Sequence, residues 1–386
     1  MRRRPFVAGG LTALAALAAT RANAATAAGS APPPDPPPLG VSHRALRFPA
    51  DHGAHPDTHI EWWYVTGWLR TGADLDPART PDLGFQVTFF RTATGLAQAS
   101  ASRFAARQLV VAHVALTDLA AGAAGSLHDQ RAGREGFGLV ATPTAAGTQT
   151  VQLRDWTLQR PAAPTPSPTR LRIQVRSERF ALALELAGTQ PLLLQGDAGY
   201  SRKGPDPGQA SHYYSEPQLA VRGRVERAGA PGREVVGRAW LDHEWSNELL
   251  PREAVGWDWV GFNLLDGSAL TAFRLRRADG GTLWAGGSFR DGAGALRIFG
   301  AGELRFEPLR HWSSPRTRAT YPVEWRLTTP AGGWRVAALQ DDQELDSRDS
   351  SGSVYWEGLS ALRREDGTAV GWGYLELTGY AGKLRL

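Results

Sequence analysis

The chain has 386 residues, of which 42% are hydrophobic and 21% charged, and its formal net charge is +5. This length is enough for two domains with a large hydrophobic core. The absence of cysteine excludes disulfides, thiolate metal sites and a cysteine nucleophile. The basic residues are scattered among acids without a basic run, so nucleic acid is not an expected partner.

The first 24 residues predict an export signal. A basic start precedes an apolar run from Phe6 to Ala19, and Ala22-Asn23-Ala24 fits the small-x-small pattern of a cleavage site. Arg3-Arg4 followed by Pro-Phe-Val favours the twin-arginine route, with an ordinary secretion signal as the alternative. The segment carries four arginines and no acid, so the remaining chain has a formal charge of +1. We therefore expect a periplasmic or secreted protein.

Residues 25–44 contain the Pro-rich stretch "ATAAGSAPPPDPPPLG" and predict a disordered tether with nothing to bury. No segment after the signal has 18 consecutive apolar residues. We therefore expect the mature chain not to span a membrane.

The rest of the sequence predicts an all-β fold. Alternating apolar and polar residues recur in runs such as "IEWWYVTGWLR", "TRLRIQVRS", "FALALEL" and "WGYLELTGY", separated by Gly, Pro, Asp and Asn turns. No stretch keeps a helical period over three turns. The segment "ARQLVVAHVALTDL" (106–119) is compatible with a helix or a strand, and we favour a strand.

A short internal sequence similarity favours two similar barrels in tandem. "WWYVTGWL" (62–69) and "WDWVGFNL" (257–264) share aromatic, Val and Leu positions, and each is followed by a run that ends in Phe-Arg. The irregular stretch "NELLPREAVG" interrupts the strand pattern between them. We therefore place an N-terminal domain at residues 45–248 and a C-terminal domain at residues 249–386.

The stretch "RAWLDHEWS" (238–246) carries the candidate catalytic residues Asp242, His243 and Glu244. Side chains alternate along a strand, so Asp242 and Glu244 share one face while His243 points to the other. An acid buried among tryptophans has a raised pKa and keeps its proton near neutral pH. His243 would assist only if a bulge turned it toward Asp242.

Aromatic side chains in three predicted strands form a candidate apolar wall. A small barrel with such walls can hold one apolar ligand in its mouth. The alternative is that the aromatics only fill the core and the nearby acids only pair with arginines. The predicted ligand-binding residues in these strands are Trp62, Tyr64, Trp240, Trp245, Trp257 and Trp259. Tyr213 and Tyr214, in "SHYYSEPQL", are added because this stretch could supply donors to a polar head group, although it could also be a polar loop before the next strand.

A metal site is the weaker interpretation. "HGAHPDTH" gathers His52, His55 and His59, but neither it nor "DHE" has the spacing of a helical zinc motif. A strand-borne site stays possible. The sequence has no Gly-x-Ser-x-Gly elbow and no phosphate-binding Gly-rich loop that opens a helix. We expect neither a metal nor a cofactor.

Several motifs in series resemble a known family. "HIEWWYVTGWL", "SHYYSEPQL", "GRAWLDHEWS", "WDWVGFNLLDGSALTAFRLR", "DDQELDS", "YWEG" and "GYLELTGY" resemble, in this order, the AttH-like and carotenoid 1,2-hydratase family of lipocalin-like proteins. The likeness covers about residues 45–386. It implies two tandem lipocalin-like antiparallel β-barrel domains in one chain.

The resemblance leaves two functions open. The AttH-like branch contains exported proteins encoded beside transport-system genes, which implies a periplasmic carrier of a long hydrophobic or amphipathic ligand, such as a lipid, that works with an ABC-type transport system. The carotenoid hydratase branch implies a cofactor-free hydro-lyase that adds water to an isoprenoid double bond. In that alternative Asp242 would be the acid, with Trp240, Trp257 and Trp259 around the cation. The export signal fits the AttH-like branch better.

Overall fold

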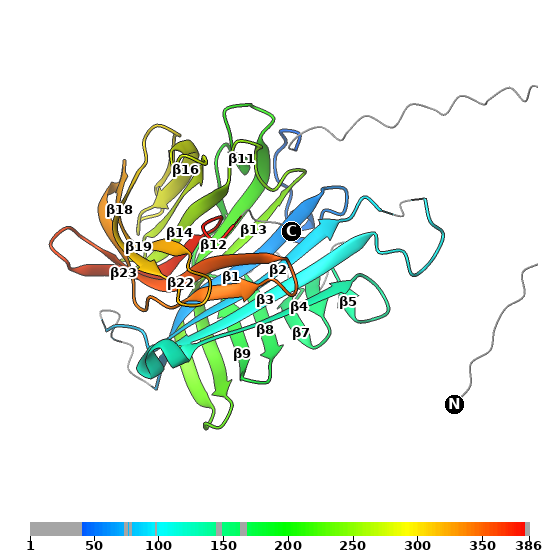
Figure 1. Ribbon diagram of the computed structural model, residues 1–386, viewed down its shortest axis with the longest axis horizontal. Helices are drawn as coiled ribbons and strands as arrows, with labels where there is room; N and C mark the ends of the chain where they lie inside the picture. The colour runs from blue at the N-terminus through cyan, green and yellow to red at the C-terminus, as the bar shows by residue number, and fades with distance from the viewer. Residues whose placement is uncertain are drawn as a thin grey trace, which may run out of the picture. The chain divides into compact units, whose positions relative to one another are not determined.

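The computed structural model describes residues 41–72, 76, 79–96, 99–143, 149–162 and 168–382. The predicted signal peptide and residues 25–40 of the predicted tether lie outside the described residues. The described residues form one compact unit built almost entirely from strands, which confirms the all-β prediction (Figure 1). Among the described residues, no helix has the length and apolar character needed to cross a membrane.

The first antiparallel sheet contains the strands of the N-terminal half in the order β4-β3-β2-β1-β13-β12-β9-β8-β7-β6-β5, with β10 and β11 attached to β12. Two 3-10 helices, η1 (Ala50–His52) and η2 (Leu119–Gly125), accompany it. The strands are β1 (Ile60–Thr71), β2 (Leu83–Ala93), β3 (Gln108–Asp118), β4 (Ser126–Arg134), β5 (Val140–Ala141), β6 (Gln149–Leu153), β7 (Trp156–Arg160), β8 (Arg170–Arg176), β9 (Phe180–Ala187), β10 (Leu193–Leu194), β11 (Tyr200–Arg202), β12 (Ala210–Arg227) and β13 (Arg233–Ser246).

The second antiparallel sheet has the order β17-β16-β15-β14-β23-β22-β20-β19-β18, with β21 attached to β22. Its strands are β14 (Gly256–Leu264), β15 (Ala269–Arg276), β16 (Thr282–Arg290), β17 (Leu296–Phe299), β18 (Arg305–Ser313), β19 (Thr320–Thr329), β20 (Gly332–Ala338), β21 (Glu344–Ser347), β22 (Ser353–Arg363) and β23 (Ala369–Leu377). The chain passes from the first sheet to the second over residues 247–255, and the predicted domain boundary falls in this segment.

The two similar segments, residues 62–69 and 257–264, lie in equivalent strands of the two sheets. β1 pairs with the second and the last strand of its sheet, β2 and β13. β14 likewise pairs with β15 and β23. The ambiguous segment around residue 113 is strand β3, which confirms the strand interpretation.

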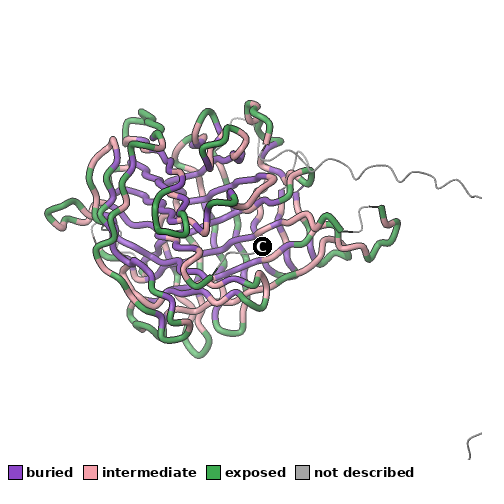
Figure 2. Tube along the Cα trace, turned by 45° about the horizontal axis from the view of Figure 1, so that its top comes forward, coloured by how far each residue is buried: buried purple, intermediate pink, exposed green. Residues whose placement is uncertain are grey.

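Burial along the strands shows where the two sheets meet. β8 alternates strictly between exposed and buried side chains, because only one of its faces packs on a core. β1 and β13 are buried on both faces over most of their length. One face of each points into the core of the first sheet, which closes nearly into a barrel where β4 and β6 lie against each other. The other face packs on the second sheet, so purple, buried tube runs through the strands in Figure 2.

A bulge in β12 fastens the two sheets together. The pairing of β12 with β13 shifts between Glu216 and Leu219, and Gln218 has a left-handed backbone with φ 56°. The backbone N–H of Gln218 donates to Oδ1 of Asn263 at 2.7 Å, and its side-chain amide donates to the carbonyls of Leu264 and Ser268. The extra residue of the bulge thus turns polar groups of the first sheet toward the β14–β15 turn.

Candidate functional site

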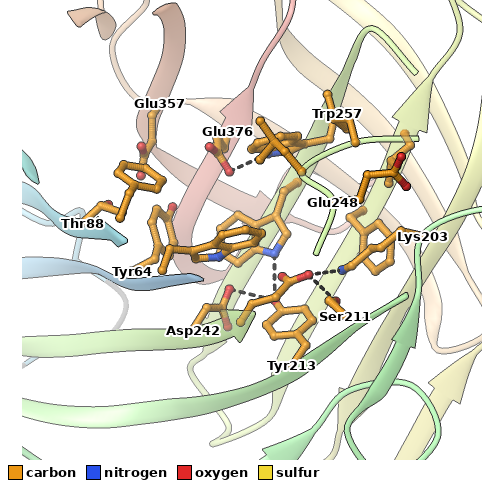
Figure 3. A pocket seen from close by; sticks show the side chains of 18 residues that line it. Tyr64, Thr88, Lys203, Ser211, Tyr213, Asp242, Glu248, Trp257, Glu357 and Glu376 are labelled. Atoms are coloured by element: carbon orange, nitrogen blue, oxygen red, sulfur yellow. Dashed lines mark hydrogen bonds and ion pairs between the residues drawn. The ribbon is translucent and has the colours of Figure 1, made fainter. Parts of the chain in front are cut away.

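A cavity of about 80 Å³ lies between the two sheets, and both contribute to its wall (Figure 3). The lining side chains come from β1, β2, β12 and β13 of the first sheet, from β14, β15, β22 and β23 of the second, and from two connecting segments. They are Trp62, Tyr64, Thr88, Phe90, Lys203, Ser211, Tyr213, Asp242, Glu244, Glu248, Leu249, Leu250, Trp257, Trp259, Phe273, Leu275, Glu357 and Glu376.

This position corrects the expectation of a ligand in the mouth of a barrel. Leu241 and Trp245 belong to the core enclosed by the first sheet. Trp240 packs instead with Phe273 and other residues of the second sheet. Because Asp242 shares the face of Trp240, the acid points out of the first sheet and toward the second.

The structure divides the predicted site residues between two faces. The cavity wall contains Trp62, Tyr64, Tyr213, Asp242, Glu244, Trp257 and Trp259. Trp240 lies behind this wall and donates its Nε1–H to Oδ1 of Asp242 at 2.7 Å. Tyr214, His243 and Trp245 are on the opposite face, where the rings of Tyr214 and Trp245 each lie against that of His243. The register of β13 with β1 is unbroken from residue 235 to 246, so no bulge turns His243 toward the cavity.

Asp242 is buried and its oxygens are held by three donors. Ser215 Oγ and Trp240 Nε1 donate to Oδ1, and Tyr213 Oη donates to Oδ2 at 2.8 Å. The hydroxyl of Tyr213 in turn accepts from Trp259 Nε1 at 3.2 Å. Burial raises the pKa of Asp242 to about 7, because it outweighs these three hydrogen bonds, which favour the carboxylate form. The charge of Glu244 acts in the same direction as burial.

Two further acids, Glu357 and Glu376, were not among the predicted site residues. They stand opposite each other on β22 and β23, in direct cross-strand register. Burial raises the pKa of Glu357 well above its usual range, and the neighbouring Glu376 adds to the shift. Burial also raises the pKa of Glu376 to about 7, although Trp257 Nε1 donates to its Oε2 at 2.9 Å. The two carboxyl groups therefore hold at least one proton between them at neutral pH.

The end of the cavity near Glu357 contains unsatisfied polar atoms. Within the described part of the chain, neither Oε1 of Glu357 nor the hydroxyl of Tyr64 makes a hydrogen bond of good geometry, and both atoms are buried. The two groups are still close enough for each to shift the pKa of the other. Buried polar atoms without partners are costly, so this end is suited to a polar ligand atom or a water molecule.

The opposite side of the cavity carries a charged pair. Lys203 Nζ lies 2.9 Å from Oε1 of Glu244, and Ser211 Oγ donates to the same oxygen at 2.5 Å. Figure 3 shows Lys203 and Glu357 on opposite sides of the cavity. Lys203 was also missed from the sequence, because it stands in the turn after β11 and outside every aromatic run.

A second polar cluster lies on the inner face of β1 and β13. His55 Nδ1 and His243 Nε2 lie 2.7 Å and 2.8 Å from Oε1 of Glu61, and Arg91 Nε donates to Oε2 at 2.8 Å. Two imidazoles and a carboxylate are a donor set that zinc accepts, and the three ligand atoms lie within 4.8 Å of one another. Both imidazoles hydrogen-bond to Glu61, which also pairs with Arg91, so these residues form a hydrogen-bonded network. Of the histidines in the 52–59 segment, His55 contacts Glu61 directly, and His52 reaches His243 through the hydroxyl of Tyr214, which lies 2.8 Å from His52 Nδ1 and 3.1 Å from His243 Nδ1.

Comparison with known proteins identifies the family of this chain. The profile of the AttH-like family matches residues 40–380, nearly the whole described chain. The chain belongs to the AttH-like family. Its structure is similar to the crystal structure of a Nitrosomonas europaea protein assigned to AttH, with 48% identity, a TM-score of 0.77 and coverage of 88% of this chain and 98% of that one. No protein among the curated sequences matches.

Two more distant structures share the fold of this AttH-like protein. Kievitone hydratase from Nectria haematococca is 14% identical with a TM-score of 0.57, and the match covers 84% of this chain and 90% of that one. CghA is also 14% identical, with a TM-score of 0.52 and coverage of 86% and 89%. At this identity the likeness concerns the fold alone. It agrees with the lipocalin-like architecture expected from the sequence.

Proposed function

We propose that this AttH-like protein is a cofactor-free acid–base catalyst of the hydro-lyase type, which adds water to a carbon–carbon double bond of an apolar or amphipathic molecule. The observation that carries the proposal is the pair Glu357 and Glu376, two carboxyl groups with raised pKa values facing a cavity with aromatic walls. A proton donor and a proton acceptor side by side are what hydration of a double bond requires.

The reaction uses the pair in two steps. Glu357 gives its proton to one carbon of the double bond, whose π electrons form the new C–H bond and leave a cation on the other carbon. A water oxygen then bonds to that carbon and loses a proton to the carboxylate of Glu376. The product has gained one water, and the proton returns from Glu376 to Glu357 before the next cycle. The Glu376 pKa of about 7 suits a group that both accepts and releases a proton.

The surrounding residues support the cation and the geometry. Trp62, Trp257 and Trp259 line the cavity, and a tryptophan face stabilises a desolvated cation by roughly 1–2 kcal/mol. Asp242 is already bonded to three donors, so we assign it to holding Tyr213 and Trp240 in place. His243 has no place in this scheme because it faces the other side of β13.

A carrier would need only the apolar wall. Two carboxyl groups opposite each other in a buried site destabilise the folded protein through desolvation and mutual repulsion. Their presence therefore favours catalysis over transport alone. The fold is also one that a named hydratase adopts.

Deuterium incorporation tests the proposal before the substrate is identified. The purified protein is incubated in D₂O with a lipid extract of its host, and the bound molecules are analysed by mass spectrometry. We expect deuterium on carbon, together with a species one water heavier, for the wild type and neither for Glu357→Gln. The same unlabelled molecule bound to both proteins would identify a carrier and overturn the catalytic proposal.

We also propose that the protein works outside the cytoplasm, as the export signal in residues 1–24 predicts. Replacing Arg3 and Arg4 by lysine should leave the full-length precursor in the cytoplasm if export follows the twin-arginine route. Fractionation of cells with an antibody to the protein gives the answer. Unchanged export of the variant would favour an ordinary secretion signal, and cytoplasmic wild-type protein would contradict export altogether.

A further inference from the structure

Lys203 is an unusual residue in this chain. The sequence contains only two lysines, Lys203 and Lys383, and all its other basic residues except histidines are arginines. Lys383 lies outside the described residues, whereas Lys203 lines the cavity with 18% of its side chain exposed. An ammonium group is compact and carries three donors, unlike the wide planar guanidinium, so the two are not interchangeable in a narrow site.

The ammonium group is held by aromatic rings and by its own turn. Lys203 Nζ lies 4.2 Å from the ring centre of Phe273 and 4.7 Å from that of Tyr213, which is the range of cation–π contacts. The backbone N–H of Lys203 donates to the carbonyl of Gln209 at 2.7 Å and closes the turn. The stem is therefore fixed at both ends before any ligand enters.

The pair of Lys203 and Glu244 leaves one donor and one acceptor for a ligand. Oε1 of Glu244 accepts a hydrogen bond from Ser211 and pairs with Lys203. Its Oε2 accepts no hydrogen bond from the residues that the structure describes. The ammonium group has three N–H donors, and Glu244 is its ion-pair partner in the described chain. A free N–H next to a free carboxylate oxygen matches an O–H group, which accepts one hydrogen bond and donates another.

The charges of this pair exclude other head groups. Lys203 already neutralises the carboxylate beside it. An anionic head group would therefore be repelled by Glu244, and a protonated amine would be repelled by the ammonium group of Lys203. A neutral hydroxyl avoids both repulsions. Glu357 lies on the opposite side of the cavity, and the tryptophans Trp62, Trp257 and Trp259 line the wall (Figure 3).

From this arrangement we infer that Lys203, Glu244 and Ser211 form a head-group subsite for a neutral hydroxyl of an alcohol, phenol or enol. This inference deepens the proposed function and rests on it, because the hydroxyl would fix the far end of the substrate while its double bond reaches Glu357. The substrate class is therefore an unsaturated, amphipathic molecule with a neutral O–H at one end.

The test compares three probes that differ only in the head group: farnesol, farnesyl methyl ether and farnesoic acid. Their affinities for the full mature protein are measured by quenching of tryptophan fluorescence. We expect farnesol to bind about tenfold more tightly than the ether, the scale of one hydrogen bond to a charged group. In Glu244→Leu, which has no acceptor for the hydroxyl proton, this ratio should fall to about one. Lys203→Met should instead weaken the binding of farnesol and of the ether alike, because both oxygens accept a hydrogen bond from the ammonium group.

Two further variants keep the test decisive. Glu244→Gln keeps a neutral acceptor and should lower the preference for farnesol by less, which covers the case in which Glu244→Leu does not fold. Arg222→Met removes an exposed cation on the outer side of β12, with 75% of the side chain exposed, and should leave the ratio unchanged.

Each outcome separates the two proposals. Equal binding of farnesol and its ether to the wild type, or a preference that survives Glu244→Leu, overturns the head-group subsite and leaves the catalytic proposal standing. Tightest binding of farnesoic acid would replace the hydroxyl by an anionic head group. If none of the probes binds, the head-group subsite is overturned, and the deuterium experiment alone decides the catalytic proposal.

Discussion

The polar clusters on the two sides of β1 and β13 contain buried acids with opposite properties. On the inner face, burial alone would raise the pKa of Glu61, but hydrogen bonds from His243 and His55 outweigh it and lower the pKa. On the outer face, the neighbours of Glu357 and Glu376 are other carboxyl groups, and both pKa values rise. Burial is common to both sites, so the neighbours decide whether an acid stabilises the fold or keeps a proton for chemistry.

The largest expected effect separates the two sites by activity. Glu357→Gln should lower turnover about 10²- to 10⁴-fold, because the amide cannot give a proton to a double bond. Ligand affinity should change little, since a glutamine resembles the protonated acid in size and charge. Single-turnover assays and fluorescence titration on the same preparation measure both quantities. Retained turnover would show that Glu357 is not the acid.

A substitution on the inner face should lower the free energy of unfolding. Glu61→Ala leaves Arg91 buried without its carboxylate and should lower the free energy of unfolding by about 3–5 kcal/mol. Denaturant unfolding followed by fluorescence checks this value. Glu357→Gln serves as the control, because removing a protonated acid should leave stability unchanged or slightly higher. Equal losses in both variants would contradict the comparison.

A sharper contrast is between Asp242 and His243, which are adjacent on β13 but point to opposite faces of the strand. His243→Asn removes a hydrogen bond to Glu61 and should cost about 1–3 kcal/mol of stability. Its effect on ligand affinity should be small, because the side chain points away from the cavity. Fluorescence titration and unfolding of the same sample decide the matter. A large loss of affinity with normal stability would place His243 in the functional site.

The smallest effect is a pH dependence of stability. The folded pKa of Glu376, about 7, lies above its ordinary value of 4.5. The folded state therefore holds a proton that the unfolded state has lost, and stability falls as the pH rises from about 4.5 through 7. Glu376→Gln removes this loss, so it should gain about 1–2 kcal/mol over the wild type at pH 8 and nothing near pH 4. Thermal unfolding at both pH values tests the sign, and a gain only at low pH would refute it.

The sequence was sufficient for the strands but not for the full site. Alternation in "TRLRIQVRS" and the turn chemistry between the runs predicted the all-β fold, because these signals are local. The raised pKa of Asp242 followed from the tryptophans beside it in the chain. Glu357 follows Tyr355 and Trp356 in the chain, but its meeting with Glu376 and with Tyr64 depends on pairing and packing between distant strands. Lys203 stands in a turn outside every aromatic run, so the sequence did not predict it as a site residue.

The location of the cavity was hidden for the same reason. A strand that is buried on both faces has no polar side to mark its orientation, so β1 and β13 gave no sign that a second sheet covers them. The sequence could assign Asp242 and His243 to opposite faces. Only the packing of the two sheets shows which of these faces is the cavity wall.

The connecting segment between the sheets has a consequence of its own. Glu248, Leu249 and Leu250 are part of the cavity wall, and the remaining wall is split between the two halves of the chain. Neither half contains a complete site, so the two sheets relate to each other as the subunits of an obligate heterodimer do. Expressed apart, each half would present its aromatic face to solvent, and activity would return only on complementation by the other.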